Sequence, residues 1–231
     1  MSEAAAPSVE SYSTFNDFFT RGLREGTRPV EAATFVSPVD GCISEVGAIE
    51  QYQIVQAKGH SYTVHALLAG DDRLSQHFHQ GQFATIYLAP KDYHRVHMPC
   101  DGRLVRMIYV PGDLFSVNPQ TARGVPGLFA RNERVICVFE SAHGTFAVVL
   151  VGATIVGSIS TVWHGVVCPP RARRVREWHY RSESVVLRKG QEMGRFLLGS
   201  TVILLFPEKT LDILAHWGPE KPVRMGEAMS H

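Results

Sequence analysis

Short apolar runs alternate with turn residues from Phe35 onward, and this pattern predicts a mainly β fold. The runs are rich in β-branched or aromatic residues and are bounded by Gly, Pro or Asp, as is typical of strands that pack on a core. Short helices between the strands are expected at 64–68 and 211–216. We expect the strands at 42–46, 83–88, 104–110, 135–139, 146–151, 184–187 and 201–206.

A further short helix is expected near the N-terminus. Thr14 is followed three residues later by Asp17, a pattern that is typical of a helix start. Three phenylalanines, Phe15, Phe18 and Phe19, then fall on one face of the helix. We expect that face to contact the core, and the alternative is contact with lipid.

The phrase Pro-x-Asp-Gly occurs twice, at 38–41 and at 99–102, with an offset of 61 residues. Each copy precedes a predicted strand, as such turns do in lipoyl-like and hybrid-motif β folds. We therefore expect an α+β fold, mainly β, in which a barrel or sandwich is built from two related hybrid-motif-like halves. No linker or low-complexity stretch divides the sequence, so 1–231 is expected to form a single domain.

The composition favours a folded globular protein, with 45% hydrophobic and 19% charged residues. The formal net charge of +1 gives no support to a nucleic-acid partner. Residues 1–11 do not read as a secretory leader, and no apolar run is long enough to cross a bilayer. Four widely spaced cysteines suggest a reducing compartment without disulfides, at positions Cys42, Cys100, Cys137 and Cys168.

The most informative chemistry lies where Gly199 and Ser200 meet the apolar run 201–206. Glycine leaves the carbonyl ahead of Ser200 sterically open. If a base takes the hydroxyl proton, Ser200 Oγ can attack that carbonyl and convert the amide to an ester. β-Elimination then leaves dehydroalanine, which hydrolyses to a pyruvoyl group and ammonia. A pyruvoyl ketone forms a Schiff base with an amine and serves as an electron sink for decarboxylation.

The quartet 198–201 and five further blocks resemble the bacterial, pyruvoyl-dependent phosphatidylserine decarboxylases of the prokaryotic type I. The resemblance implies a carboxy-lyase of phospholipid biosynthesis that converts phosphatidylserine to phosphatidylethanolamine and carbon dioxide. It also implies a zymogen that cleaves itself between Gly199 and Ser200 into 1–199 (the β chain) and 200–231 (the α chain), with a covalent pyruvoyl group from Ser200. The other blocks follow in order at 37–41, 56–62, 93–99, 109–118 and 129–134.

The resemblance also implies roles for individual residues. The Asp–His–Ser set that the family uses for self-cleavage falls on Asp40, His97 and Ser200. The chemistry agrees, because a carboxylate can orient an imidazole that takes a serine proton. His94 matches the family residue implicated in decarboxylation. The spacing of His94 and His97 is weak evidence for a metal, and no third ligand is evident, so no metal is expected.

The resemblance further implies phosphatidylserine and an anionic membrane surface as partners, with the protein peripheral on the cytoplasmic face of the bacterial inner membrane. A homodimer, or a heterodimer of cleaved chains, is expected. Family members typically carry a longer amphipathic N-terminal stretch, whereas eleven residues precede Tyr12 here. One basic cluster is either solvated or membrane-facing, and it comprises Arg171, Arg173, Arg174, Arg176 and Arg181 with Trp178 and Tyr180.

Three other functions stay open on the residues alone. One is a pyruvoyl decarboxylase with another substrate, either a soluble amino acid or a different serine phospholipid. Another is a serine hydrolase built on Asp40, His97 and Ser200, although Ser200 lacks the Gly-x-Ser-x-Gly elbow of α/β-hydrolases. The third is a non-enzymatic lipoyl-like or hybrid-motif binding module, in which Asp40 would be a turn former and Ser200 an ordinary strand residue.

Overall fold

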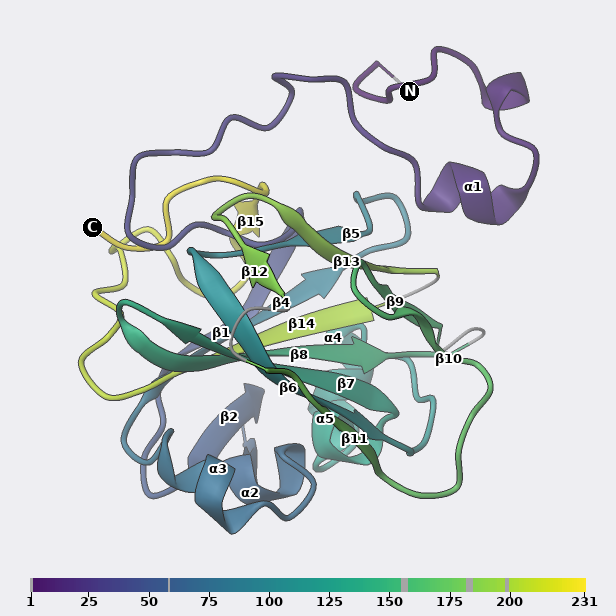
Figure 1. Cartoon of the computed structure of the whole chain (residues 1–231). Coiled ribbons are helices and arrows are strands. Elements are labelled where there is room, and N and C mark those ends of the chain that lie inside the picture. The colour runs from purple at the N-terminus through teal and green to yellow at the C-terminus, as the bar shows by residue number, and fades with distance from the viewer. Residues whose placement is uncertain (1, 58, 155–157, 182–184, 198–199) are drawn as a thin grey trace.

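The computed structural model describes residues 2–57, 59–154, 158–181, 185–197 and 200–231, and its strands form two stacked antiparallel sheets (Figure 1). The larger sheet contains, in spatial order, β11 (Arg176–His179), β6 (Gly102–Val110), β7 (Arg134–Ser141), β8 (Gly144–Gly152), β14 (Ser200–Phe206), β4 (Gln82–Leu88), β1 (Gly41–Ala48) and β15 (Pro222–Val223), and β12 (Val186–Leu187) also pairs with β6. The smaller sheet contains β10 (Gly165–Cys168), β9 (Ile159–Thr161), β13 (Glu192–Phe196) and β5 (Arg95–His97).

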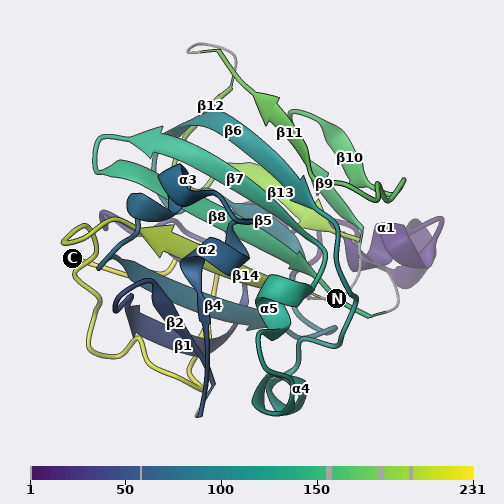
Figure 2. The same cartoon turned by 90° about the horizontal axis from the view of Figure 1, so that it is seen from below.

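The two faces of the larger sheet are covered differently. The smaller sheet lies over one face, and helices with a two-stranded β2–β3 unit lie over the other (Figures 1 and 2). This second layer consists of β2 (Gln53–Ala57), β3 (His60–Thr63), α2 (Val64–Leu67), α3 (Asp72–Gln76), α4 (Pro119–Gly124) and α5 (Leu128–Arg131). A 3₁₀ turn at Val9–Ser11 and α1 (Phe15–Phe19) lie on the other side of the larger sheet, near β5 (Figure 1). The expected mainly β, sandwich-like fold is confirmed.

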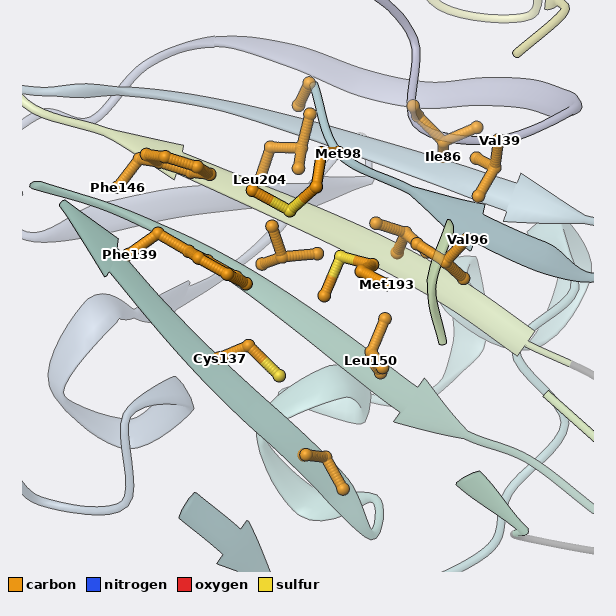
Figure 3. Packing of buried hydrophobic residues seen from close by; sticks show 14 of the residues in the cluster. Val39, Ile86, Val96, Met98, Cys137, Phe139, Phe146, Leu150, Met193 and Leu204 are labelled. Atoms are coloured by element: carbon orange, nitrogen blue, oxygen red, sulfur yellow. The ribbon is translucent and has the colours of Figure 1, made fainter. Parts of the chain in front are cut away.

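The central strand β14 is buried on both sides. Its side chains alternate, so that Val202 and Leu204 join the cluster between the sheets while Ile203 and Leu205 join the cluster under the helices. Figure 3 shows the first cluster, in which Leu204 lies among side chains of both sheets. Because both faces are buried, the strand is apolar at successive positions instead of alternating with polar residues.

The seven predicted strands are confirmed, as β1, β4, β6, β7, β8, β12 and β14. Position 184, the predicted start of β12, lies outside the described residues. The N-terminal helix is confirmed with its cap, because the amide of Asp17 donates to Thr14 Oγ1 (3.1 Å). Within α1 only part of the expected face is buried, since Phe19 lies in the interior while Phe15 is 65% exposed. The helix expected at 64–68 is confirmed as α2.

The helix expected over 211–216 is wrong, because this segment is irregular. The Leu211 amide donates to the side chain of Gln82 (2.9 Å), and Ile213 forms an isolated bridge with Ser230. Leu211 is nevertheless buried in the cluster between the sheets. The apolar spacing in the sequence therefore reports burial of this segment and not helical geometry.

The two Pro-x-Asp-Gly phrases occupy equivalent places in the structure. The amide of Val36 donates to the carbonyl of Pro99, and the amide of His97 donates to the carbonyl of Pro38, each at 2.9 Å. The two donors, Val36 and His97, are 61 residues apart, and so are the two acceptors, Pro38 and Pro99. The two phrases are therefore joined by equivalent backbone hydrogen bonds. The phrases open β1 and β6, whose pairing with β4 and β7 also shifts register at equivalent positions. These correspondences support the expected pair of related halves.

The aspartates of the two phrases share a structural role. Asp40 and Asp101 each accept a backbone N–H through Oδ1, from the residue that precedes a glycine in the left-handed region. The donors are Met225 (2.9 Å) and Lys189 (2.7 Å), and the glycines are Gly226 and Gly190, with φ of +90° and +77°. Asp40 therefore orders the turn around Gly226, whatever further role it has.

Truncating the central strand should destabilise the whole sandwich. Leu204→Ala removes a fully buried side chain, and we expect a loss of about 2–5 kcal/mol in unfolding free energy. Val186→Ala, at a 63% exposed position of β12, is the control and should change stability by less than about 1 kcal/mol. Denaturant unfolding in a Ser200→Ala background measures both, and equal losses would contradict the packing described here.

Candidate active site

Ser200 is the first residue of β14, and its side chain lies in the interior. Its register partners are Leu88 on β4 and Gly152 on β8. Alternation along the strand places Ser200 on the same face as Val202, which is the face covered by the smaller sheet. Among the described residues, no hydrogen-bond partner is present for Ser200 Oγ. A buried hydroxyl without a partner costs free energy, and a reactive role is one explanation for it. Gly199, the residue on the other side of the expected cleavage, lies outside the described residues.

His94 lies in the turn before β5 and is completely buried. Its Nδ1 lies 2.9 Å from the carbonyl of Asp92, and because a carbonyl can only accept, Nδ1 carries the proton. The ring of Phe19 packs against the imidazole, with centroids 4.1 Å apart. Burial lowers the pKa of His94 to about 4. His94 is therefore neutral near pH 7, and Nε2 presents a lone pair that has no partner within the described part of the chain.

Asp40 lies immediately before β1 and is held by a buried arginine. Arg28 Nε contacts Oδ1 (2.9 Å) and Oδ2 (3.1 Å), and an NH2 group of Arg28 donates to Oδ2 (2.5 Å). The hydrogen bond to Asp40 raises the pKa of Arg28, so this cation is permanent. With the amide of Met225 on Oδ1, both carboxylate oxygens have partners.

His97 lies at the end of β5, and each of its ring nitrogens has a partner. Nδ1 donates to the carbonyl of Gly190 (2.8 Å), and Nε2 accepts from the hydroxyl of Tyr93 (3.0 Å). Burial lowers the pKa of His97, and burial also raises the pKa of Tyr93 to about 12. The pair is therefore a neutral imidazole and a protonated phenol near pH 7.

The structure brings the expected residues into one region without joining them by hydrogen bonds. The segments of Asp40 and His97 are bonded through the carbonyl of Pro38, whereas the two side chains bond to other groups. Phe196 of β13, four residues before Ser200, donates its amide to the carbonyl of His94 (3.0 Å). His94 is thus bonded to β13, the strand that precedes Ser200 in the sequence.

Two partners in this region were missed by reasoning from the sequence. Arg28 lies in an irregular segment twelve residues before Asp40, and no motif indicates that it reaches the carboxylate. Tyr93 lies within a block that resembles the family, and its spacing of four residues from His97 could have suggested the contact.

A cavity of about 350 Å³ beside Asp40 is lined by charged side chains, including Arg21, Arg28, Lys91 and Asp92. Asp40 thus separates the interior from a polar opening.

The neighbours of His94 and His97 do not resemble a metal centre. Within the described ranges, no group of three or more His, Cys, Asp or Glu side chains is arranged to hold a metal ion. Nor does any helix in the described part of the chain have the length and apolar character needed to cross a membrane.

Comparison with known proteins assigns the chain to a family. The family model described as phosphatidylserine decarboxylase matches residues 15–231. A phosphatidylserine decarboxylase proenzyme from Variovorax paradoxus (strain S110) is 64% identical over 231 residues, covering 100% of this chain and 82% of the relative. Proteins of the same name from Polaromonas naphthalenivorans (strain CJ2) and Dechloromonas aromatica (strain RCB) are 66% and 63% identical, covering 100% and 99% of this chain and 81% of each relative.

The fold is a β sandwich in which, within the described residues, a serine hydroxyl and one nitrogen of a histidine are buried without hydrogen-bond partners. The chain belongs to the phosphatidylserine decarboxylase family. The resemblance inferred from the sequence blocks is confirmed.

Protonation of His94 should weaken the fold in acid. Its folded pKa, about 4, lies below the ordinary histidine value near 6.5, so the unfolded chain binds the proton more tightly. The stability contribution is complete above about pH 6.5 and is lost as the pH falls toward 4, by about 3 kcal/mol.

Comparing unfolding free energies of Ser200→Ala and Ser200→Ala/His94→Gln between pH 7 and 4.5 isolates this dependence. The pH dependence should be shallower in the His94→Gln protein. His77→Gln, at an exposed position, is the control and should leave it unchanged. Parallel pH profiles for His94→Gln and its parent would contradict the buried neutral imidazole.

Proposed function

We propose that this protein decarboxylates phosphatidylserine to phosphatidylethanolamine after cutting itself between Gly199 and Ser200. Family membership and the proenzyme names of relatives support the proposal. The observation that carries it is the buried hydroxyl of Ser200, which has no competing hydrogen bond among the described residues. The mature molecule would consist of 1–199 and 200–231 held together as a heterodimer, or as a homodimer of that unit.

The surroundings of Ser200 fit a pyruvoyl group at this position. A pyruvoyl group supplies an electrophilic ketone and an electron sink for decarboxylation. The side chain of residue 200 lies in a dry layer beneath the smaller sheet, where apolar neighbours such as Val96 and Phe196 belong to the same cluster as Val202. Low polarity strengthens any electrostatic interaction that is made in this layer.

Asp40 and His97 are proposed as the groups that promote self-cleavage. His97 Nε2 carries a lone pair that accepts from Tyr93 in this structure, and the same lone pair can accept the Ser200 proton if the imidazole exchanges partners. Asp40, fixed by Arg28, supplies a negative charge that favours the resulting imidazolium. His94 is proposed to act in decarboxylation, supported by its neutral ring and partnerless Nε2.

Intact mass measurement tests the self-cleavage. The purified protein should yield a fragment of residues 200–231 whose terminus is blocked by a pyruvoyl group, whereas Ser200→Ala should stay whole. A wild-type chain of full length with an ordinary serine at position 200 would overturn the proposal.

The two related halves provide a matched pair for the role of Asp40. Asp40→Asn and Asp101→Asn change aspartates with equivalent backbone bonds, but Asp40 also pairs with Arg28. We expect Asp40→Asn to slow maturation by at least about tenfold and Asp101→Asn to have little effect, measured as fragment appearance over time. Equal slowing would reduce Asp40 to its turn-forming role. His97→Ala should slow cleavage as Asp40→Asn does.

Peripheral binding to an anionic membrane, on the cytoplasmic face of the inner membrane, is proposed as the route to the substrate. The segment from β10 to β11 supports it, because Arg173 and Arg174 are exposed beside Val166 and Val175, which are about half exposed. Arginines with adjacent apolar side chains suit the head-group region of an anionic leaflet.

Flotation with vesicles tests this surface. The Arg173→Glu/Arg174→Glu protein should bind phosphatidylserine-containing vesicles at least about tenfold more weakly, since each basic residue near the surface contributes about 1 kcal/mol. Lys209→Glu/Lys221→Glu reverses two exposed charges elsewhere and should bind normally. An equal loss in both proteins, or none in either, would remove this segment from the membrane contact.

A further inference from the structure

Glu133 lies on the same row of the larger sheet as Ser200. It directly precedes β7, and its carbonyl accepts the amide of Gly152 (2.8 Å). Gly152 is in turn the register partner of Ser200. Residues directly opposite one another in antiparallel strands point to the same face. The side chains of Glu133 and Ser200 therefore leave the sheet on one face, with a glycine between them.

The next row along the same three strands confirms which face this is. Val135 on β7 and Val202 on β14 each pair with Leu150 on β8, and all three belong to the cluster between the sheets. Glu133 and Ser200 lie two residues before Val135 and Val202, so they face the same layer. Figure 1 shows β7, β8 and β14 side by side. Two strand spacings separate the outer residues of a row, on the order of 10 Å between Cα atoms.

The carboxylate of Glu133 is buried, and its two oxygens differ in their contacts. Its side chain is 1% exposed, and both contacts of known length fall on Oε2, from Tyr109 Oη (2.7 Å) and Arg171 Nε (3.3 Å). Within the residues described, Oε1 is buried without a hydrogen-bond partner. Burial, the charge of Glu133 and a hydrogen bond to its carboxylate raise the pKa of the Cys168 thiol to about 12, so Cys168 stays protonated beside Glu133.

An unused carboxylate oxygen in a dry layer is unfavourable unless a cation or donor occupies it at some stage. The site next to it lacks a side chain at Gly152, and Ser200 follows on the far side. Resting on the proposed function, the substrate brings one group of matching charge to residue 200, which is the primary ammonium of its serine moiety. That group must also lose a proton before its nitrogen can act as a nucleophile.

We propose that Glu133 is the binding site for the primary ammonium of the substrate and the acceptor of its proton. Oε1 receives an N–H of the ammonium in a charge-assisted hydrogen bond. One proton then passes from nitrogen to the carboxylate, which leaves a neutral amine with a free lone pair and a neutral Glu133. Tyr109 and Arg171 act on Oε2 and hold the carboxylate in place.

Calorimetric titration of the uncut Ser200→Ala protein with glycerophosphoserine tests the site without any dependence on turnover. The same compound with an acetylated amine lacks the cation and is the matched probe. We expect the free amine to bind about 10- to 100-fold more tightly than the acetylated form, as a charged hydrogen bond implies. Glu133→Gln should abolish this difference, and Glu133→Asp should retain part of it.

Glu140→Gln is the control, because Glu140 lies in β7, the strand that follows Glu133, but is exposed and pairs with Arg103. It should leave the preference for the amine unchanged. Circular dichroism and the unfolding midpoint verify that each variant is folded, and Glu133→Asp keeps the test available should Glu133→Gln not fold. An amine preference that survives in folded Glu133→Gln overturns the proposal, as does the absence of any preference in the parent protein.

The maturation rate of Glu133→Gln, read by mass, separates this site from the processing reaction. Slow cleavage with an intact amine preference would assign Glu133 to processing and overturn the binding role. If the wild-type chain never cleaves while the Glu133-dependent preference is present, the proposed self-processing fails and the ammonium site stands.

Discussion

Burial of β14 on both faces is the constraint on which the rest of this structure depends. A strand whose successive side chains must all be apolar needs cover above and below, and the smaller sheet and the helical layer provide it. The first residue of the strand, Ser200, is buried, and it is the one polar residue of β14 on the face that the smaller sheet covers. The position of the candidate site therefore follows from the packing of the sheet.

The polar groups around that strand divide into two kinds. Some are fully satisfied and fix the backbone, as Arg134 does by donating to four carbonyls beneath the sheet. Others are buried with an atom that has no partner among the described residues. They include Ser200, His94 and Glu133 on the side of the smaller sheet, and Thr85 and Thr201 on the opposite face. Such atoms weaken a fold, and the candidate site includes several of them.

The strands could be predicted because turn residues and β-branched runs mark them locally, as at 104–110 and 201–206. The segment around Leu211 could not, because its apolar residues are held by contacts with Gln82 and Ser230, which are remote in sequence. The same limit applies to the site. Family blocks indicate Asp40 and His97. The hydrogen bonds from Arg28 to Asp40 and from Tyr93 to His97 depend on the tertiary structure.

Residues 200–231 supply two strands of the larger sheet, the middle strand β14 and the edge strand β15, which pairs with β1. A break before Ser200 would thus leave two polypeptides that share one hydrophobic core, because β14 supplies side chains to both clusters and most of their other members precede residue 200. Reassembly after full separation would then be a bimolecular reaction that competes with aggregation of the exposed strand, whereas the uncut chain folds by itself. The topology therefore requires that folding come before any cleavage at this position.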